Sequence, residues 1–162
     1  MNSLVAFARS HGASPEHLAP LWRSWLAGET PEPSSRRARA PRSFLEALPE
    51  LRARLERLAT VRSEHLSSDG SRRLLVELAD GASVEAVLLP RGALCISTHV
   101  GCSVGCLFCK TGEQGLLRQL SSAEIVAQVA VARRLGEARR VVLMDMGEPA
   151  DRKSTRLNSS HT

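Results

Sequence analysis

The sequence predicts an α/β protein: a small amino-terminal helical domain, then a β-hairpin, then the first units of a partial α/β barrel. Three observations support this fold class. Apolar residues recur with a helical period near 3.6 over residues 1–63 and with a period of two over residues 66–89, the spacings of amphipathic helices and half-buried strands. The apolar run Arg140–Met144 follows a strongly capped helix, which is the order of a parallel β/α unit.

Length and composition are those of a globular protein. The chain has 162 residues, the length of one average domain, with 43% hydrophobic and 24% charged residues and a net charge of +5. We divide it into a helical domain (residues 1–63), a hairpin linker (64–92), the start of the barrel core (93–150) and a tail (151–162).

Membrane and secreted classes do not fit the sequence. No apolar run approaches the roughly 20 residues that span a bilayer, and the first residues are too short and polar for a secretory signal. We therefore expect a soluble, cytoplasmic monomer with no membrane partner.

Two amphipathic helices account for most of the helical domain. Ser14 and Pro15 form an N-cap with proline at the first helical position, and Gly28 ends that helix. A second helix runs from about Ser43 to Ala59. The apolar faces consist of Leu18, Leu21, Trp22, Trp25 and Leu26 in the first helix and Phe44, Leu45, Leu48, Leu51, Leu55 and Leu58 in the second.

A Pro/Arg-rich linker, residues 29–42, joins the two helices. Its arginines have two interpretations, which the sequence leaves open: solvated side chains of a linker, or contacts to RNA phosphates. They are Arg36, Arg37, Arg39 and Arg42.

Strand patterns follow from residue 66 onward. Leu74–Ala79 and Val84–Leu89 are predicted strands joined by a two-residue turn at Asp80-Gly81, and Ala93–Thr98 is a third extended run. A Gly/Cys-rich loop, His99 to Gly115, comes next. The capping box of Ser121 and Glu124 then opens a helix that runs through Leu135, ahead of the apolar strand Arg140–Met144.

The last residues break with the composition of the rest of the chain. From Asp151 it reads DRKSTRLNSSHT, with no periodicity and no apolar anchor. Back-translation of Asp151–His161 resembles the read-through of a common sequencing adapter; an ordinary charged tail is the alternative. We expect a non-native tail, with the natural protein cut short here, and without this tail the net charge falls to +3.

All four cysteines lie close together, at Cys95, Cys102, Cys106 and Cys109. Such clustering is typical of a metal or redox site rather than of a disulfide scaffold. Three thiolates in the spacing C-x3-C-x2-C can hold three irons of a cubane and leave the fourth iron open. Zinc is the alternative metal, with His99 as the fourth ligand.

The motif GCSVGCLFC, with Phe108 before the last cysteine, resembles the signature of radical S-adenosylmethionine (SAM) enzymes. The resemblance implies a 4Fe-4S cluster on Cys102, Cys106 and Cys109 and a SAM site formed with Phe108. It also implies the start of a partial (β/α)6 barrel. The segment Gly147-Glu148-Pro149 is similar to the family's GEP motif, which implies that Gly147 and Glu148 contact SAM.

The match is closer than superfamily level, because LSSDGSRRLLVELADGASVEAVLLPRGALCISTHVGCSVGCLFCKTGEQGLLRQLSSAEIVAQV, followed by VVLMDMGEP, is similar to the RlmN/Cfr family of rRNA adenine methyltransferases. So is the helical domain, which the resemblance implies is an accessory RNA-binding domain. The resemblance covers nearly all of residues 1–150 but half or less of such an enzyme. We therefore expect a truncated and inactive amino-terminal fragment.

The resemblance implies methylation of adenine C2 in 23S rRNA and tRNA through a methyl-cysteine intermediate, with an electron donor such as flavodoxin. Cys95 matches the family's resolving cysteine, which forms a disulfide that releases the product. Glu85 matches the base that removes the C2 proton, and we expect it to point inward on the same face as Val87 and Leu89. The methyl-carrying cysteine has no counterpart after Cys109.

Two alternatives remain open. Asp145 stands where the family usually has glycine, and Lys110 follows the last cluster cysteine where serine or alanine is usual. One alternative is therefore a radical SAM paralogue with another substrate, such as adenine C8. The other is a non-enzymatic, zinc-bearing RNA-binding module with Cys102, Cys106, Cys109 and His99 as ligands.

Overall fold

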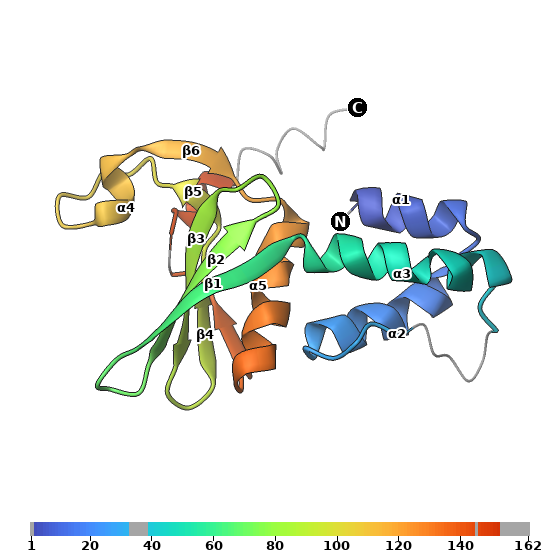
Figure 1. Ribbon diagram of the computed structural model, residues 1–162. Coiled ribbons are helices and arrows are strands. Elements are labelled where there is room, and N and C mark those ends of the chain that lie inside the picture. Colours follow the sequence, from blue (N-terminus) through green and yellow to red (C-terminus); the bar gives the residue numbers. More distant parts are fainter. Residues whose placement is uncertain (1, 33–38, 145, 153–162) are drawn as a thin grey trace.

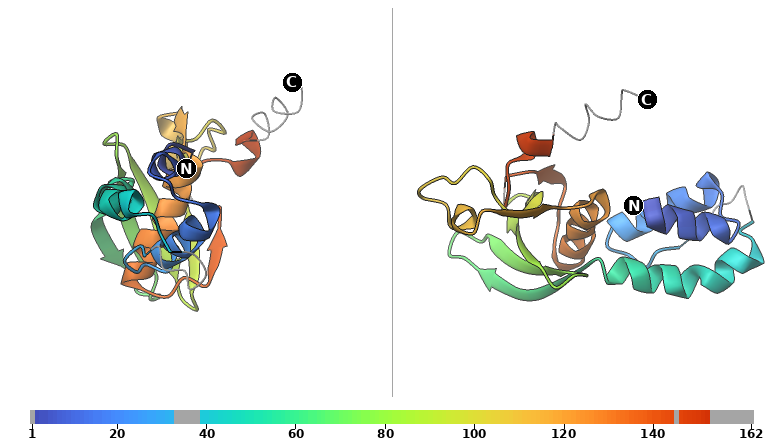
Figure 2. Two further views of the ribbon diagram at one scale, coloured as in Figure 1. Left: turned by 90° about the vertical axis from the view of Figure 1, so that its right-hand side faces the viewer. Right: turned by 90° about the horizontal axis from the view of Figure 1, so that it is seen from above.

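The main parts of the described chain are three amino-terminal helices, a mixed sheet with one helix across it and a small two-stranded ribbon (Figure 1). A short helix in the cysteine-rich region and a 3-10 helix, Pro149–Arg152, complete it. The computed structural model describes residues 2–32, 39–144 and 146–152. The amino-terminal helices lie at one end of the molecule and the ribbon at the other (Figure 2). The mixed α/β class predicted from the sequence is confirmed.

The amino-terminal helices are α1 (Asn2–Ser10), α2 (Pro15–Leu26) and α3 (Arg42–Glu56). They pack through most of the predicted apolar faces, since Leu21, Trp25, Phe44 and Leu51 are all buried in one core. Leu45 is the exception in α3, because its side chain is 48% exposed. Helix α2 begins after Ser14, as the N-cap and Pro15 predict. Its carboxyl end is fixed to the rest of the fold, because Arg133 Nη1 donates a hydrogen bond of 2.8 Å to the Leu26 carbonyl.

The predicted helical region to residue 63 is wrong at its end. Helix α3 stops at Glu56, and β1 (Ala59–Leu66) begins the sheet instead. The β-branched residues Thr60 and Val61 favour an extended chain, and β1 pairs antiparallel with β2 (Arg72–Leu78) along its length. Tertiary pairing therefore overrides the helical periodicity here.

The arginine-rich linker is only partly described. Arg36 and Arg37 lie outside the described residues, so the structure leaves their role untested. Arg39 and Arg42 are exposed, and Arg42 Nε lies 2.9 Å from Glu46 Oε1.

Strands β1, β2, β3 (Ser83–Leu89) and β4 (Ala93–Ile96) form an antiparallel meander. The predicted β2–β3 hairpin is confirmed, but its turn is longer than the predicted two residues. Leu78 N donates to Ala82 O at 2.8 Å, so the loop contains residues 79–81. Its last residue, Gly81, has a φ of +84°, as a three-residue hairpin loop requires.

Helix α5 (Ser122–Leu135) connects β4 to β7 (Arg140–Val142), which pair in parallel as predicted. The capping box is confirmed, with Ser121 N 2.7 Å from Glu124 Oε2 and Glu124 N 3.3 Å from Ser121 Oγ. The expected burial of the last strand is wrong, because β7 is the terminal strand in the order β1-β2-β3-β4-β7 and Val141 is 41% exposed.

The predicted loop from His99 to Gly115 contains further structure. It holds β5 (His99–Gly101) and the short helix α4 (Lys110–Glu113), and it is followed by β6 (Leu116–Gln119). Strands β5 and β6 pair antiparallel and form a separate ribbon, which carries the cysteine loop, residues 102–109, at its end. None of the helices in the described ranges has the length and apolar character needed to cross a bilayer.

Candidate functional site

The chain leaves the main sheet at Ser97, one residue beyond β4, and enters the ribbon. Gln128 of α5 holds this point: Ser97 N donates to Gln128 Oε1 at 3.0 Å, and Gln128 Nε2 donates to Ser97 O at 3.0 Å. Both residues are fully buried, at 0% exposure. The Ser97 hydroxyl donates a further bond of 2.6 Å to the Glu85 carbonyl, so β3, β4 and α5 are joined at one position.

The segment after β7 crosses this same position. Met146 N donates to Ser97 Oγ at 3.2 Å, and Thr98 N donates to Met146 O at 2.9 Å. The next residue, Gly147, has a φ of +95°, and a Cβ there would lie 2.3 Å from His99 Nδ1. Glycine is therefore required for the segment to lie against β5.

Glu148, which the sequence predicts as a SAM contact, is exposed, and its Oε1 accepts a hydrogen bond of 2.8 Å from Ala150 N. The structure thus brings Gly147 beside the strand that leads into the cysteine loop. The Glu148 carboxylate instead accepts a hydrogen bond from the backbone two residues further along the chain.

The three predicted cluster ligands occupy one exposed loop. Cys106 is exposed, while Cys102 and Cys109 are half-buried, and all three are thiols rather than disulfides. Cys102 N donates to Gly115 O at 3.1 Å, which closes the base of the loop. The fourth thiol, Cys95, is buried in β4.

Cys109 has an environment that favours its thiolate. Hydrogen bonds from the Thr111 hydroxyl, and then from the backbone N–H groups of Thr111 and Gly112, lower the pKa of the Cys109 thiol. A thiolate is the form of cysteine that binds metals and attacks electrophiles.

The donor set fits a metal cluster in chemistry, since three accessible soft sulfur ligands lie on one short loop. The loop conformation does not gather them: within the described ranges, no three His, Cys, Asp or Glu side chains are close enough to hold a metal ion. Phe108, predicted to contact SAM, is 92% exposed on this loop. The structure therefore places Phe108 on the cysteine loop with its side chain largely in solvent.

His99, the alternative zinc ligand, lies elsewhere. Its side chain is 1% exposed, with Nδ1 2.8 Å from Thr98 Oγ1 and the ring against Gly147. The structure does not bring it together with the three cysteines of the loop. The four-ligand zinc set is therefore not assembled in this conformation.

Glu85 and Cys95 share one face of the sheet. Cys95 is paired with Val87 in the register of β3 and β4, and alternation puts Val87 on the same face as Glu85. The expected common face for Glu85, Val87 and Leu89 is thus confirmed. The expected inward direction needs correction: Val84, Ala86 and Leu88 are buried in the core, while Glu85 is half-buried and Leu89 exposed.

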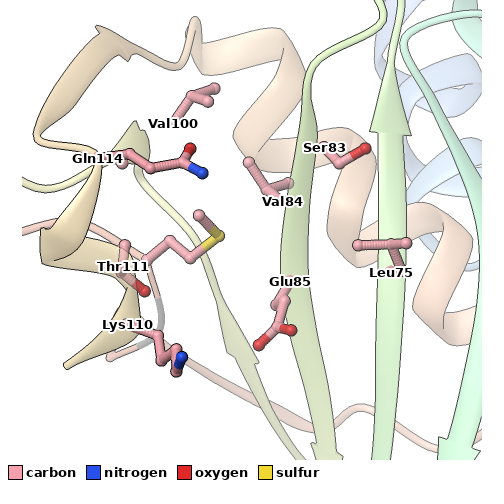
Figure 3. Close-up of a pocket in the computed structure, with 10 residues that line it drawn as sticks. Leu75, Ser83, Val84, Glu85, Val100, Lys110, Thr111 and Gln114 are labelled. Atoms are coloured by element: carbon pink, nitrogen blue, oxygen red, sulfur yellow. The ribbon is translucent and has the colours of Figure 1, made fainter. Parts of the chain in front are cut away.

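The Glu85 carboxylate enters a cleft between β3 and the ribbon instead (Figure 3). This cleft has a volume of about 280 Å³. Glu85 Oε1 lies 4.0 Å from Arg73 Nη1 on the neighbouring strand β2. The cleft is lined by Leu75, Ser83, Val84, Glu85, Val100, Gly101, Lys110, Thr111, Gln114 and Met146.

Lys110, Thr111 and Gln114 form one wall of the cleft directly after Cys109, and no sequence motif predicts a role for them. Their position depends on the ribbon, which no sequence pattern predicts. Gln128 could have been noticed in the sequence, because it is a polar residue between the apolar residues Ala127 and Val129 of α5. The structure shows that all three are buried.

Arg118 of β6 fixes the ribbon to the sheet. Its Nη2 lies 2.7 Å from Asp80 Oδ2 in the β2–β3 loop and 2.7 Å from Glu124 Oε1 in α5. Burial alone would raise the pKa of Glu124, but hydrogen bonds from Arg118 and Ser121 outweigh it and lower the pKa. The ion pairs in turn raise the pKa of Arg118.

No protein-family model matches the chain, but individual relatives do. A "Probable RNA methyltransferase" of Stutzerimonas stutzeri is 55% identical over 143 residues, covering 86% of this chain and 42% of that protein. One of Thiobacillus denitrificans is 56% identical over 146 residues, covering 88% of this chain and 40% of that protein.

A solved structure is also similar. A radical SAM methyltransferase from Sphaerobacter thermophilus has a TM-score of 0.56 and 33% identity, covering 71% of this chain and 39% of that chain. The chain therefore spans about two-fifths of the length of the proteins it matches. It is a homologue of proteins named probable RNA methyltransferases, and it shares its mixed α/β fold with part of a radical SAM methyltransferase.

Proposed function

We propose that this chain belongs to a radical SAM methyltransferase that modifies C2 of an adenine in 23S rRNA and tRNA. One observation carries the proposal: a loop with three cysteines lies directly beside a cleft that holds Glu85, in a chain 55% identical to a probable RNA methyltransferase. A carboxylate next to a metal-competent thiol loop is suited to proton removal beside a redox centre.

Cys102, Cys106 and Cys109 would hold a 4Fe-4S cluster, and the lowered pKa of the Cys109 thiol supports its role as a thiolate ligand. A cluster held there would supply one-electron reducing chemistry for the cleavage of SAM. Gly147 and Glu148 would position SAM, because the segment that carries them is hydrogen-bonded to the strand leading into the loop. Phe108 would cover SAM from the loop.

Glu85 would accept the adenine C2 proton, and Cys95 would form the disulfide that releases the methylated product. Their common sheet face supports a shared reaction space, and the Ser97 hydroxyl fixes the backbone of Glu85 relative to β4. Burial of Cys95 in β4 protects its thiol until the partner cysteine approaches.

The partners follow from this chemistry. We propose RNA as the substrate, an electron donor such as flavodoxin, a cytoplasmic location and a monomeric enzyme. We also propose that the amino-terminal helices α1, α2 and α3 form an accessory domain that contacts RNA.

Methylation at adenine C8 is the second candidate, because the unusual residue Lys110 lines the cleft that would receive the base. Mass spectrometry of 23S rRNA and tRNA adenines, from cells with and without the full-length gene, separates the two positions. Loss of 2-methyladenine without the gene supports the first proposal, and loss of 8-methyladenine supports the second. Unchanged adenines in both RNAs contradict both.

Anaerobic reconstitution with iron and sulfide tests the cluster on this chain itself. A brown protein that loses its colour in Cys102→Ala supports the proposal, and Cys95→Ala is the matched control because Cys95 lies outside the loop and should keep the colour. A colourless protein in the absence of oxygen, or stoichiometric zinc retained in air, overturns it.

A further inference from the structure

The cysteine loop contains a tight turn that joins two of its three thiol-bearing residues. Cys109 N donates a hydrogen bond of 3.0 Å to Cys106 O, which closes a four-residue turn with Leu107 and Phe108 at its centre. Leu107 is fully exposed and Phe108 is 92% exposed. The turn is therefore held by its backbone and not by burial of its central side chains.

A turn of this kind brings its two end residues close together. The Cα atoms at the first and fourth positions of a β-turn lie within about 7 Å of each other. A disulfide needs Cα atoms about 4.4–6.8 Å apart, so the two ranges overlap. Cys106 and Cys109 can therefore be linked without a large movement of the backbone.

Cys102 does not share this turn. Its N–H donates to Gly115 O at 3.1 Å, which fixes it at the base of the loop, and three residues separate it from Cys106. Among the residues that the structure describes, no three His, Cys, Asp or Glu side chains are close enough to form a metal site. In this conformation the loop therefore presents a pair of cysteines rather than a set of three.

Both cysteines of the turn can be reached from solvent. Cys106 is exposed and Cys109 is half-buried, whereas Cys95 is buried in β4. Disulfides in a reducing compartment are usually transient and redox-sensing, and exposed disulfides are the labile ones. An accessible dithiol held in a turn has the properties of such a pair.

We propose that, when no metal occupies the loop, Cys106 and Cys109 are oxidised to a reversible intramolecular disulfide by a low-molecular-weight disulfide such as oxidised glutathione. One cysteine thiolate attacks the oxidant, forms a mixed disulfide and releases one glutathione thiolate. The other attacks the protein sulfur of the mixed disulfide, closes the new S–S bond and releases the second glutathione thiolate. The two glutathione thiolates take up the protons that the cysteines lose, so two thiols are oxidised and one disulfide is reduced.

The disulfide removes two of the three ligands proposed for the cluster. Oxidation of the pair therefore blocks cluster assembly until a thiol reduces it again. This consequence rests on the proposed function. Formation of the disulfide does not, because it needs neither iron nor SAM.

The test uses the reduced 162-residue chain, kept metal-free by a chelator and free of oxygen, and treated with oxidised glutathione. After alkylation of the remaining thiols, chymotrypsin cleaves behind Leu107 and Phe108, so Cys106 and Cys109 lie on separate peptides that only a disulfide joins. Mass spectrometry identifies the linked cysteines. The variants are Cys106→Ser and Cys109→Ser, and Cys102→Ser is the matched control because Cys102 lies in the same loop but outside the turn.

We expect the link between Cys106 and Cys109 to be about tenfold more abundant than either link that contains Cys102, because only this pair is closed by the turn. Cys102→Ser should leave the yield of this link unchanged. Cys106→Ser and Cys109→Ser should each accumulate the glutathione mixed disulfide on the remaining cysteine of the turn. An excess of reduced glutathione should restore both thiols in the unmodified chain.

Equal yields of the three links overturn the inference. So does a Cys102 link that forms at full yield in either Cys106→Ser or Cys109→Ser, a chain that oxidised glutathione leaves reduced, or a disulfide that reduced glutathione cannot reverse. A chain that forms this disulfide but stays colourless on reconstitution contradicts the proposed function alone. A chain that becomes brown but never forms the disulfide contradicts this inference alone.

Discussion

Replacing Gln128 by leucine tests the junction between the main sheet and the ribbon. Leucine fills a similar volume but can neither donate nor accept, so the N–H and C=O of Ser97 lose partners that now lie 3.0 Å away. Each unpaired buried backbone group costs about 1–3 kcal/mol, and the added apolar burial offsets part of the loss. We expect Gln128→Leu to lower the free energy of unfolding by about 2–4 kcal/mol.

Urea denaturation of the full chain, followed by far-ultraviolet circular dichroism, measures this loss. Gln119→Leu is the matched control, since its side chain is only half-buried and lies outside the junction, and it should change stability by less than about 0.5 kcal/mol. Equal destabilisation by the two variants, or a loss below about 1 kcal/mol for Gln128→Leu, would refute the reasoning.

Three further predictions concern the surroundings of the site. Gly147→Ala should lower the urea midpoint much more than Gly81→Ala, because a Cβ at Gly147 meets a side chain at 2.3 Å while one at Gly81 meets nothing within 4 Å; similar midpoints would contradict this. The folded-state pKa of Glu124 is lowered, so the stability that depends on Arg118 is present above about pH 5 and declines as the pH falls towards 3. The difference in unfolding free energy between the chain and Arg118→Ala should therefore shrink over that range, and a difference that grows in acid argues against the pair. At pH 7, iodoacetamide should modify Cys109 faster than the more exposed Cys106, because hydrogen bonds lower the Cys109 pKa; peptide mass spectrometry that finds the reverse order would exclude this effect.

Much of the fold could be predicted because local patterns and tertiary contacts agree there. The apolar face of α2, the capping box at Ser121 and the parallel strand after α5 each follow from spacing alone. Strand β1 could not be predicted, since the apolar spacing of α3 continues past Glu56 and only pairing with β2 settles the conformation.

The site shows the same division. Motifs in the sequence predict the cysteine loop and Gly147 as site residues, because the spacing of sulfur ligands and the segment after a strand are local features; their roles stay predictions. The wall that carries Lys110 and Gln114 could not be found in this way. It depends on β6 returning beside β5 and on Arg118 contacting two distant elements, and no local period encodes such contacts.

A glutamine side chain ends in the same pair of groups as a peptide bond. At Ser97, where the chain turns away from its neighbours in the sheet, the Gln128 carboxamide takes the place that an adjoining strand would otherwise occupy. A helix thereby substitutes for a strand at one residue. The backbone can therefore pass from the main sheet into the ribbon within the hydrophobic interior while both the N–H and the C=O of Ser97 keep a hydrogen-bond partner.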